Sequence, residues 1–244
     1  MEFSEFYNIC KSVFAANPQL PHIDEDKANM LYFLTNRMLE VNKTMNLTAI
    51  KDENAIILRH YADSLMISEF LSPNSSIMDV GCGAGFPTLP LAIFRPDLKI
   101  TALDSTAKRI EYVRNTAEML NLRNVTAISE RAEVLGNSNE YREKFDYATA
   151  RAVAALPVLT ELCLPFVKTG GHFIAMKAQK GDEELSASMN AISKCGGELK
   201  NSYVKELNDA NGSAETRIII VVSKIKHTPN EFPRHFSKIS KKPL

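Results

Sequence analysis

A glycine-rich turn in the first half of the chain constrains the fold more than any other feature of the sequence. An apolar run at 77–80 leads directly into Gly81, Gly83 and Gly85, which alternate with other residues. Alternating glycines let the backbone turn sharply at the carboxyl end of a strand and approach a ligand with no Cβ in between. Because an apolar, helix-like run follows from residue 87, the turn predicts a βα unit with a ligand site at its strand end.

Short apolar runs alternate with longer amphipathic runs after residue 76, a pattern that predicts βαβ units and a parallel sheet. We expect strands at 77–80, 100–104, 125–129, 145–150 and 172–176, and helices at 87–94, 106–120, 156–166 and 182–195. The strands expected at 198–206 and 215–223 are joined by a short turn and must therefore be antiparallel. The predicted fold class is α/β, with a layout that resembles the Rossmann-like class I methyltransferase fold: a seven-stranded, mostly parallel sheet whose last strand is antiparallel.

Three segments are expected along the chain. Residues 1–75 form an N-terminal helical extension, with helices at 3–16, 24–43 and 53–71, and residues 76–223 form the ligand-binding domain. Residues 224–244 form a basic tail with 6 Lys and Arg against 1 acidic residue, although the net charge of the whole chain is 0. A local excess of positive charge attracts polyanions. The tail is therefore a candidate RNA contact, and a disordered solubilising tail is the alternative.

The cysteines and the apolar runs bear on compartment and metal content. The four cysteines form no C-x-x-C pair, and none lies near a histidine at metal-ligand spacing, so we expect free thiols and no metal site. No run approaches the roughly 18 apolar residues of a membrane span, and the first ten residues carry acids where a secretory signal would be positive. We expect a cytoplasmic protein that works as a monomer without membrane contact.

Asp104 narrows the class of cofactor. It lies nineteen residues after Gly85 at the end of the next expected strand, where a carboxylate can accept both hydroxyls of a ribose. The register is G-x-G-x-G, with Phe86 and Pro87 at the place of the third glycine of a dinucleotide fingerprint, which disfavours a bound pyrophosphate. S-adenosylmethionine has a ribose and an amino-acid end but no phosphate. The turn therefore predicts this cofactor, and a tight turn without a ligand would not explain Asp104.

Residues after the third and fourth strands suggest the rest of the site. Arg131, Ala132 and Glu133 are placed to flank an adenine ring, with Glu133 accepting from its exocyclic amine; the alternative is an exposed acid that stabilises a helix start. Arg151 stands where amino-methylating enzymes carry an Asp/Asn-Pro-Pro-aromatic motif, which is absent. No cysteine follows this strand as a nucleophile for pyrimidine C5 chemistry. The methyl acceptor is therefore expected to be neither an exocyclic amine nor a pyrimidine carbon.

Several motifs point together to one family. They are Asn46-Leu47-Thr48, Arg59-His60-Tyr61-Ala62-Asp63-Ser64-Leu65, the run 79–90, Leu103-Asp104-Ser105, Lys108-Arg109, Arg131-Ala132-Glu133, Arg151-Ala152 and Met176-Lys177-Ala178-Gln179. With these motifs the chain resembles the bacterial small-subunit rRNA guanine-N7 methyltransferases, also called glucose-inhibited division protein B. It departs from that family at Ala178, where glycine is usual, and at Phe232, where the tail usually has tyrosine.

The resemblance implies transfer of a methyl group from S-adenosylmethionine to guanine N7 in 16S ribosomal RNA, with naked RNA, a precursor particle or the small subunit as the partner. It implies cofactor contacts from Gly81, Phe86, Ala132, Glu133 and Arg151, to which the physical argument adds Gly83, Gly85 and Asp104. Since N7 carries a lone pair and no proton, no general base is obligatory. Candidates for positioning the substrate are Arg151, Lys177 and His60, and candidates for RNA binding are Arg234, Lys238, Lys241 and Lys242.

Some roles stay open at the level of sequence. The spacing of Arg59 and Asp63 fits an ion pair within one helix. His60 is either a packing residue or a neighbour of the methyl donor, and Phe86 either faces the base or packs with Leu89. Two rival functions also remain: a methyltransferase of small molecules or proteins, and a cofactor-binding regulatory protein without catalysis.

Overall fold

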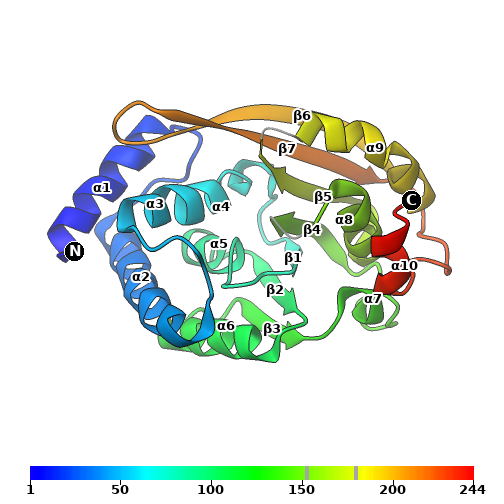
Figure 1. Ribbon diagram of the computed structural model, residues 1–244, viewed down its shortest axis with the longest axis horizontal. Helices are drawn as coiled ribbons and strands as arrows, with labels where there is room; N and C mark the ends of the chain where they lie inside the picture. The colour runs from blue at the N-terminus through cyan, green and yellow to red at the C-terminus, as the bar shows by residue number, and fades with distance from the viewer. Residues whose placement is uncertain (152–153, 179–180) are drawn as a thin grey trace.

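The computed structural model describes residues 1–151, 154–178 and 181–244. Within these residues, seven strands form one sheet in the order β3-β2-β1-β4-β5-β7-β6 (Figure 1). The strands are β1 Ser76–Val80, β2 Lys99–Asp104, β3 Val125–Ser129, β4 Phe145–Arg151, β5 Val167–Lys177, β6 Gly197–Asn208 and β7 Ala214–Lys224. β1 to β5 pair in parallel, and β7 is antiparallel to both β5 and β6. The predicted fold class is confirmed.

Alternation along the strands divides the interior into two cores, one on each face of the sheet. Ile77 of β1 and Ile219 of β7 belong to one core, whereas their neighbours Met78 and Ile220 belong to the other. Successive side chains of a strand point to opposite faces, so a sheet covered on both sides needs apolar residues at every position. This explains the continuous apolar runs in the interior of the sheet, such as residues 218–222 of β7.

The helices cover the two faces. The first core is shared with α1 Phe3–Ala16, α2 Glu25–Met45, α5 Thr88–Phe94 and α6 Ala107–Met119. The second is covered by α7 Ala132–Leu135, α8 Leu156–Cys163, α9 Gly181–Lys194 and α10 Phe236–Lys241, with a 3₁₀ turn η3 Leu164–Phe166 after α8. Because the N-terminal helices and the sheet share one core, the extension is packed against the domain along its length.

The expected helix at 53–71 is divided in the structure. It consists of α3 Glu53–Ile56, a π-helical turn η1 Ile57–Ala62, α4 Asp63–Leu65 and a 3₁₀ turn η2 Ser68–Phe70. The Asp63 amide donates to the carbonyl of Leu58, five residues back, so the carbonyl of Arg59 has no α-helical partner at Asp63. Arg151 Nη1 donates to that Arg59 oxygen at 2.7 Å. The wide turn thus presents a main-chain acceptor to the end of β4, as π turns often do at functional sites.

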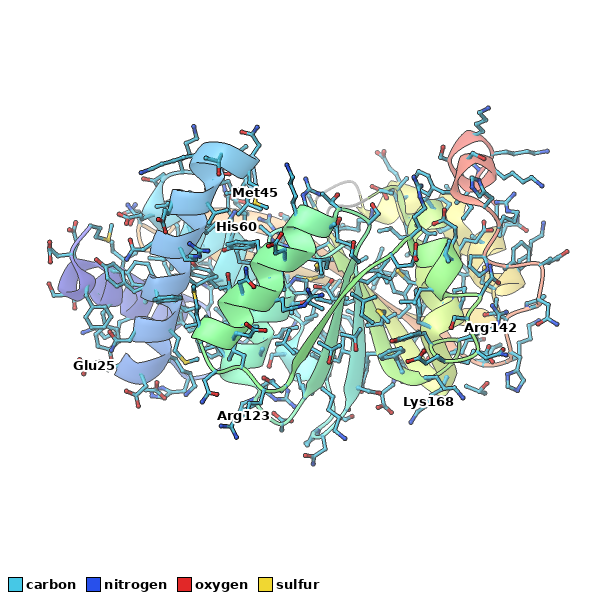
Figure 2. All side chains as sticks on the ribbon, turned by 90° about the horizontal axis from the view of Figure 1, so that it is seen from below. Glu25, Met45, His60, Arg123, Arg142 and Lys168 are labelled. Atoms are coloured by element: carbon cyan, nitrogen blue, oxygen red, sulfur yellow. The ribbon has the colours of Figure 1, made fainter. Side chains whose placement is uncertain are left out.

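The C-terminal tail is folded, so the alternative of a disordered tail is wrong. Ile239 of α10 is fully buried in the second core, and Phe232 is buried with it. Arg142 holds the preceding segment: its guanidinium donates to the main-chain carbonyls of Thr228, Pro229 and Phe232. α10 lies beside α8 (Figure 1). In Figure 2, α10 and His60 lie toward the upper side of the molecule, and Lys168 lies toward the lower side.

Candidate functional site

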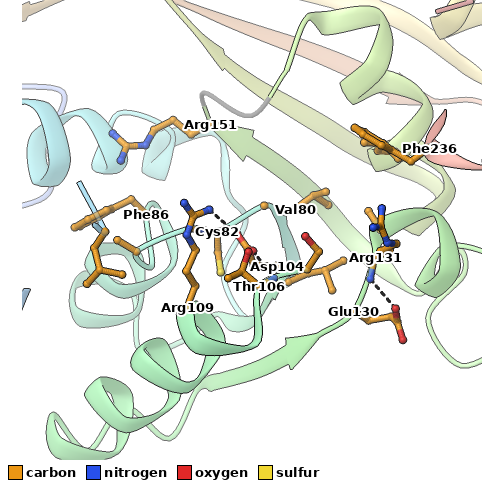
Figure 3. Close-up of a pocket in the computed structure, with 18 of the residues that line it drawn as sticks. Val80, Cys82, Phe86, Asp104, Thr106, Arg109, Glu130, Arg131, Arg151 and Phe236 are labelled. Carbon is orange, nitrogen blue, oxygen red and sulfur yellow. Dashed lines mark hydrogen bonds and ion pairs between the residues drawn. The ribbon is translucent and has the colours of Figure 1, made fainter. Parts of the chain in front are cut away.

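A cavity of about 470 Å³ opens at the carboxyl ends of β1 to β4 (Figure 3). Its walls come from the glycine loop after β1, the end of β2, the turn between β3 and α7, and Arg151 at the end of β4. Leu47, Thr48 and His60 of the N-terminal extension close one side, and Phe236 of α10 closes another. Strand register produces this convergence, because Val80 pairs with Leu103 and Asp104 pairs with Ser129.

The glycine loop has a backbone that other residues would adopt only with strain. Gly81, Gly83 and Gly85 have φ angles of 75°, 57° and 87°. A Cβ on Gly85 would also lie 2.6 Å from Cδ1 of Leu89, so this glycine allows α5 to pack closely under the loop. The amide of Gly83 is turned toward β2, where it donates to Asp104 Oδ2 at 3.0 Å.

Asp104 is held in place from two sides while it lines the cavity. Oδ1 accepts from the amide of Thr106 at 2.8 Å, Oδ2 accepts from Gly83, and the Arg109 guanidinium lies 3.8 Å from Oδ2. Each carboxylate oxygen has two acceptor sites, so one remains on each for a further donor. A ribose with two adjacent hydroxyls fits this arrangement of a fixed, nearly buried carboxylate.

Glu133 lies at the start of α7, at the end of the cavity that Phe236 closes. It is 5% exposed, which contradicts the alternative of an exposed helix-start acid. The Phe236 amide donates to Glu133 Oε1 at 3.4 Å, and the Arg131 guanidinium lies 3.9 Å from the same oxygen. Ala132 lines the cavity beside it. The arrangement offers an acceptor to an exocyclic amine, as an adenine would require.

His60 and Phe86 form a stacked pair on the side of the N-terminal extension. Their ring centres are 4.4 Å apart with an interplanar angle of 10°. Burial, and secondarily the charge of Arg151, lower the pKa of His60 to about 4, so its ring is neutral at pH 7. Arg151 Nη2 lies 3.4 Å from Nδ1 and can only donate, which assigns the ring proton to Nε2, facing Thr48 Oγ1 at 2.9 Å. His60 therefore packs and hydrogen-bonds, and it also lines the cavity.

The stack with His60 also decides whether Phe86 packs inside the protein or faces the base. One face of its ring is covered by His60, and the guanidinium carbon of Arg151 lies 5.3 Å from its centre. The side chain is 5% exposed, although it lines the cavity. Phe86 is therefore a packed support for His60 and Arg151.

Arg151 belongs to a chain of ion pairs that ties the site to the hairpin of β6 and β7. Its Nη1 donates to Asp63 Oδ2 at 2.8 Å, and Asp63 Oδ1 accepts from Arg217 Nε at 2.7 Å. Arg59 pairs with Glu215 at 2.7 Å. The expected pair of Arg59 with Asp63 is therefore wrong, because Asp63 is taken by two guanidinium groups from the sheet.

Lys177 is not brought to the cavity with the other candidates. Its ammonium donates to the main-chain carbonyl of Ala154 at 2.6 Å and pairs with Glu184 at 2.7 Å. Glu184 in turn accepts from the amide of Leu156, at the start of α8. These contacts give Lys177 a role in holding the segment that follows β4. Ala152 and Gln179, which belong to two of the motifs, lie outside the described residues.

Asp79, one residue before Val80 in β1, is a feature of the site that sequence reasoning did not use. It is 1% exposed, and Thr88 Oγ1 at the start of α5 donates to its Oδ2 at 2.6 Å. Burial raises its pKa to about 6. Its signal in the sequence was an acid inside an otherwise apolar strand. Phe236 was missed as well, and no local pattern marks it.

The candidate RNA-binding cations differ in their surroundings. Arg234 donates from Nε and Nη2 to the Glu161 carboxylate at 2.8 and 2.6 Å, and Glu161 is fully buried. Lys238, Lys241 and Lys242 are exposed on and after α10. Several side chains of α10 extend away from the body of the protein (Figure 2), although Ile239 is buried. Arg234 is thus occupied by an internal partner, whereas the three lysines face solvent.

The arrangement of the described residues bears on the expectations about metal binding, free thiols and membrane-spanning helices. No three His, Cys, Asp or Glu side chains among these residues gather where they could hold a metal ion. Cys10, Cys82, Cys163 and Cys195 are buried free thiols. Among the same residues, no helix combines the length and the apolar character that crossing a membrane needs.

Comparison with known proteins gives one family. The family model described as rRNA small subunit methyltransferase G matches residues 27–212. A protein of Alkaliphilus metalliredigens named ribosomal RNA small subunit methyltransferase G is 43% identical over 225 residues, 91% of this chain and 93% of that protein. A protein of the same name from Staphylococcus carnosus is 46% identical over 210 residues, which cover 85% and 86% of the two chains.

Solved structures resemble the fold at low sequence identity. A SAM-dependent methyltransferase from Aquifex aeolicus aligns with a TM-score of 0.53 at 16% identity, covering 72% of this chain and 96% of that one. A transferase from Pyrococcus horikoshii aligns with a TM-score of 0.52 at 14% identity, covering 67% and 63%. At these identities the likeness shows the shared fold.

Proposed function

The chain belongs to the rRNA small subunit methyltransferase G family, and on that premise we propose that it transfers a methyl group from S-adenosylmethionine to N7 of a guanine in 16S ribosomal RNA. The observation that carries the cofactor half of the proposal is the fixed Asp104 carboxylate in the middle of the cavity, with Glu133 toward the end that Phe236 closes (Figure 3). The acceptor half is supported by the family and by Arg151 at the place of an amino-methylation motif.

The residues of the cavity divide into two groups by what they would hold. Asp104 would accept from the ribose hydroxyls and Glu133 from the adenine amine, while Gly81 and Gly83 keep side chains out of the path of the cofactor. Gly85 does not line the cavity and instead gives α5 room to pack. S-adenosylmethionine supplies an electrophilic methyl group on a sulfonium. On the opposite side, His60 and Arg151 face the space that is left for the target base.

No group in the site has to remove a proton, because guanine N7 carries an in-plane lone pair. The low pKa of His60 agrees with this, since a neutral, packed imidazole supports neighbouring groups without titrating near pH 7. Catalysis would then consist of holding the reacting atoms in line, which can lower the activation free energy by roughly 7 to 11 kcal/mol. Methylation leaves positive charge on the base, so we place Arg151 against O6, a phosphate or the cofactor carboxylate, and not against N7.

We further propose that the enzyme works as a monomer in the cytoplasm and meets RNA through the exposed cations of its tail. The target nucleotide must be unstacked or already lie in a loop for N7 to reach the cavity. The lysines of α10 stand near the Phe236 side of the cavity and could contact phosphates of the flanking RNA.

The test is transfer of a labelled methyl group to small-subunit rRNA, followed by nuclease digestion and mass spectrometry of the nucleosides. We expect N7-methylguanosine, absent from rRNA of cells that lack the gene and restored by the wild-type gene but not by an Asp104→Asn variant. N6-methyladenosine as the product would contradict the assignment. Transfer to small molecules or proteins without RNA, or cofactor binding without transfer, would establish the rival functions.

A further inference from the structure

We propose that Phe236 is a cofactor-contacting residue, and that α10 closes the adenine end of the cavity with its aromatic ring. The inference rests on the proposed function, since it assigns a new contact to the same cofactor. If Phe236 contacts the cofactor, the C-terminal tail forms a wall of the site.

Phe236 lies where an adenine would be held. Its side chain lines the cavity together with Ala132, Glu133 and Leu162, and its amide donates to Glu133 Oε1 at 3.4 Å. Figure 3 shows Phe236 at the end of the cavity near Arg131, opposite the end that holds Arg151 and Phe86. Glu133, the acceptor proposed for the adenine amine, and the ring of Phe236 therefore come from two segments of the chain that meet at this end of the cavity.

The position of the ring is fixed by contacts that do not need a ligand. Arg234, two residues earlier, forms a two-pronged pair with the fully buried Glu161 of α8. Asn137 Nδ2, just after α7, donates to the carbonyl of Pro233 at 3.1 Å. Three residues later, Ile239 is fully buried. Anchors on both sides of Phe236 thus hold the ring at the cavity before anything binds.

The chemistry of this corner selects a heteroaromatic base that carries an amine. Phe236 is 37% exposed and lines the cavity, whereas Ile239 in the same helix is fully buried, so the ring is an apolar surface open to the cavity. An aromatic face is covered favourably by another ring, and a neighbouring carboxylate accepts from an amine at the edge of that ring. A purine with an exocyclic amine satisfies both groups at once.

Calorimetry with S-adenosylhomocysteine tests the inference without requiring turnover. Since stacking of a base on an aromatic side chain is worth a factor of about five to a hundred in affinity, Phe236→Ala should weaken binding by about fivefold or more. Phe236→Tyr keeps the ring and should bind like the wild type. Phe33→Ala is the matched control, because Phe33 is 40% exposed on α2, outside the cavity; it should leave the affinity unchanged.

A second probe, S-ribosylhomocysteine, shares the ribose and the amino-acid end but lacks the base. Its affinity should be the same for the wild type and Phe236→Ala. The inference is overturned if Phe236→Ala binds S-adenosylhomocysteine like the wild type, or if it loses affinity for both ligands equally. If Phe236→Ala lowers the melting temperature, Phe236→Leu, which keeps apolar bulk without an aromatic face, replaces it and should still bind less tightly. A wild-type protein that does not bind S-adenosylhomocysteine would instead refute the proposed function.

Discussion

Arg151 Nη1 donates to Asp63 Oδ2 at 2.8 Å, and this contact joins the end of β4 to the N-terminal extension. The other oxygen of Asp63 accepts from Arg217 of β7 at 2.7 Å, so one carboxylate orients two guanidinium groups. The π turn before Asp63 adds the Arg59 carbonyl as a third contact of the network. A residue outside the sheet therefore sets the position of a guanidinium group that lines the cavity.

Asp63→Asn should destabilise the protein by about 3 kcal/mol, because it leaves two largely buried guanidinium groups without their charged partner. Urea unfolding measures the loss, and methyl transfer should fall as Arg151 loses its orientation. The matched control is Glu215→Gln, which removes a more exposed carboxylate from Arg59 and Arg217 and should cost less than about 1 kcal/mol. Equal losses in the two variants would show that Asp63 is an ordinary surface partner.

Asp104→Asn should weaken the binding of S-adenosylhomocysteine by about tenfold to a hundredfold, since hydrogen bonds to a charged acceptor contribute roughly 1.5 to 3 kcal/mol. The amide keeps one acceptor oxygen, which can replace the acceptor of either Gly83 or Thr106. Asp97→Asn is the control: Asp97 accepts from Arg95 at 2.7 Å before β2 begins, outside the cavity. Unchanged affinity in Asp104→Asn would exclude a contact between this carboxylate and the ribose.

The pH dependence of stability should report the environment of His60. Its folded pKa of about 4 lies below its ordinary value of 6.5, so between these values the unfolded chain binds the proton first. The contribution of the neutral His60 ring to the free energy of unfolding is therefore fully present above pH 6.5. It declines as the pH falls and is lower by about 3 kcal/mol at pH 4. The raised pKa of Asp79 acts in the opposite direction below about pH 6.

Variants of His60 and Asp79 separate the effects of these two side chains on the pH dependence of stability. The free energy of unfolding of His60→Gln should fall less between pH 7 and pH 4 than that of the wild type, whatever its absolute value. Asp79→Asn, which removes the opposing gain, should fall more steeply. Parallel curves for all three proteins would mean that neither side chain is as strongly perturbed as its burial implies.

Features that depend on local order could be predicted from the sequence. The strands follow from apolar runs between turns, and the glycine loop follows from its register, so β3 occupies the residues expected, 125–129, and α1 occupies 3–16. The π turn at Ile57–Ala62 could not be predicted in this way. Periodicity continues through it, and the group that takes the Arg59 carbonyl is Arg151, on a distant strand.

The sequence of the tail also does not predict which of its charges are exposed. Its composition gives a net excess of five positive charges over residues 224–244, but it does not show which of them are neutralised inside the fold. Lys224 is 1% exposed and pairs with Glu143, while Arg234 pairs with Glu161. The place of Phe236 depends on the pair of Arg234 with Glu161, and α10, at six residues, is too short to leave a periodic pattern.

Replacement of Lys238, Lys241 and Lys242 by glutamine should weaken RNA binding without changing stability, because all three are exposed. If each contacts one phosphate of single-stranded RNA, the slope of log K against log salt should become shallower by about 2.

Arg234→Gln is the contrasting variant for this test. It strands the fully buried Glu161 carboxylate, so it should destabilise the protein by about 3 kcal/mol or more. Deletion of residues 227–244 would mix the two effects, since it removes the lysines and the anchor together. An unchanged salt slope in the triple variant would show that the RNA contact lies elsewhere on the protein.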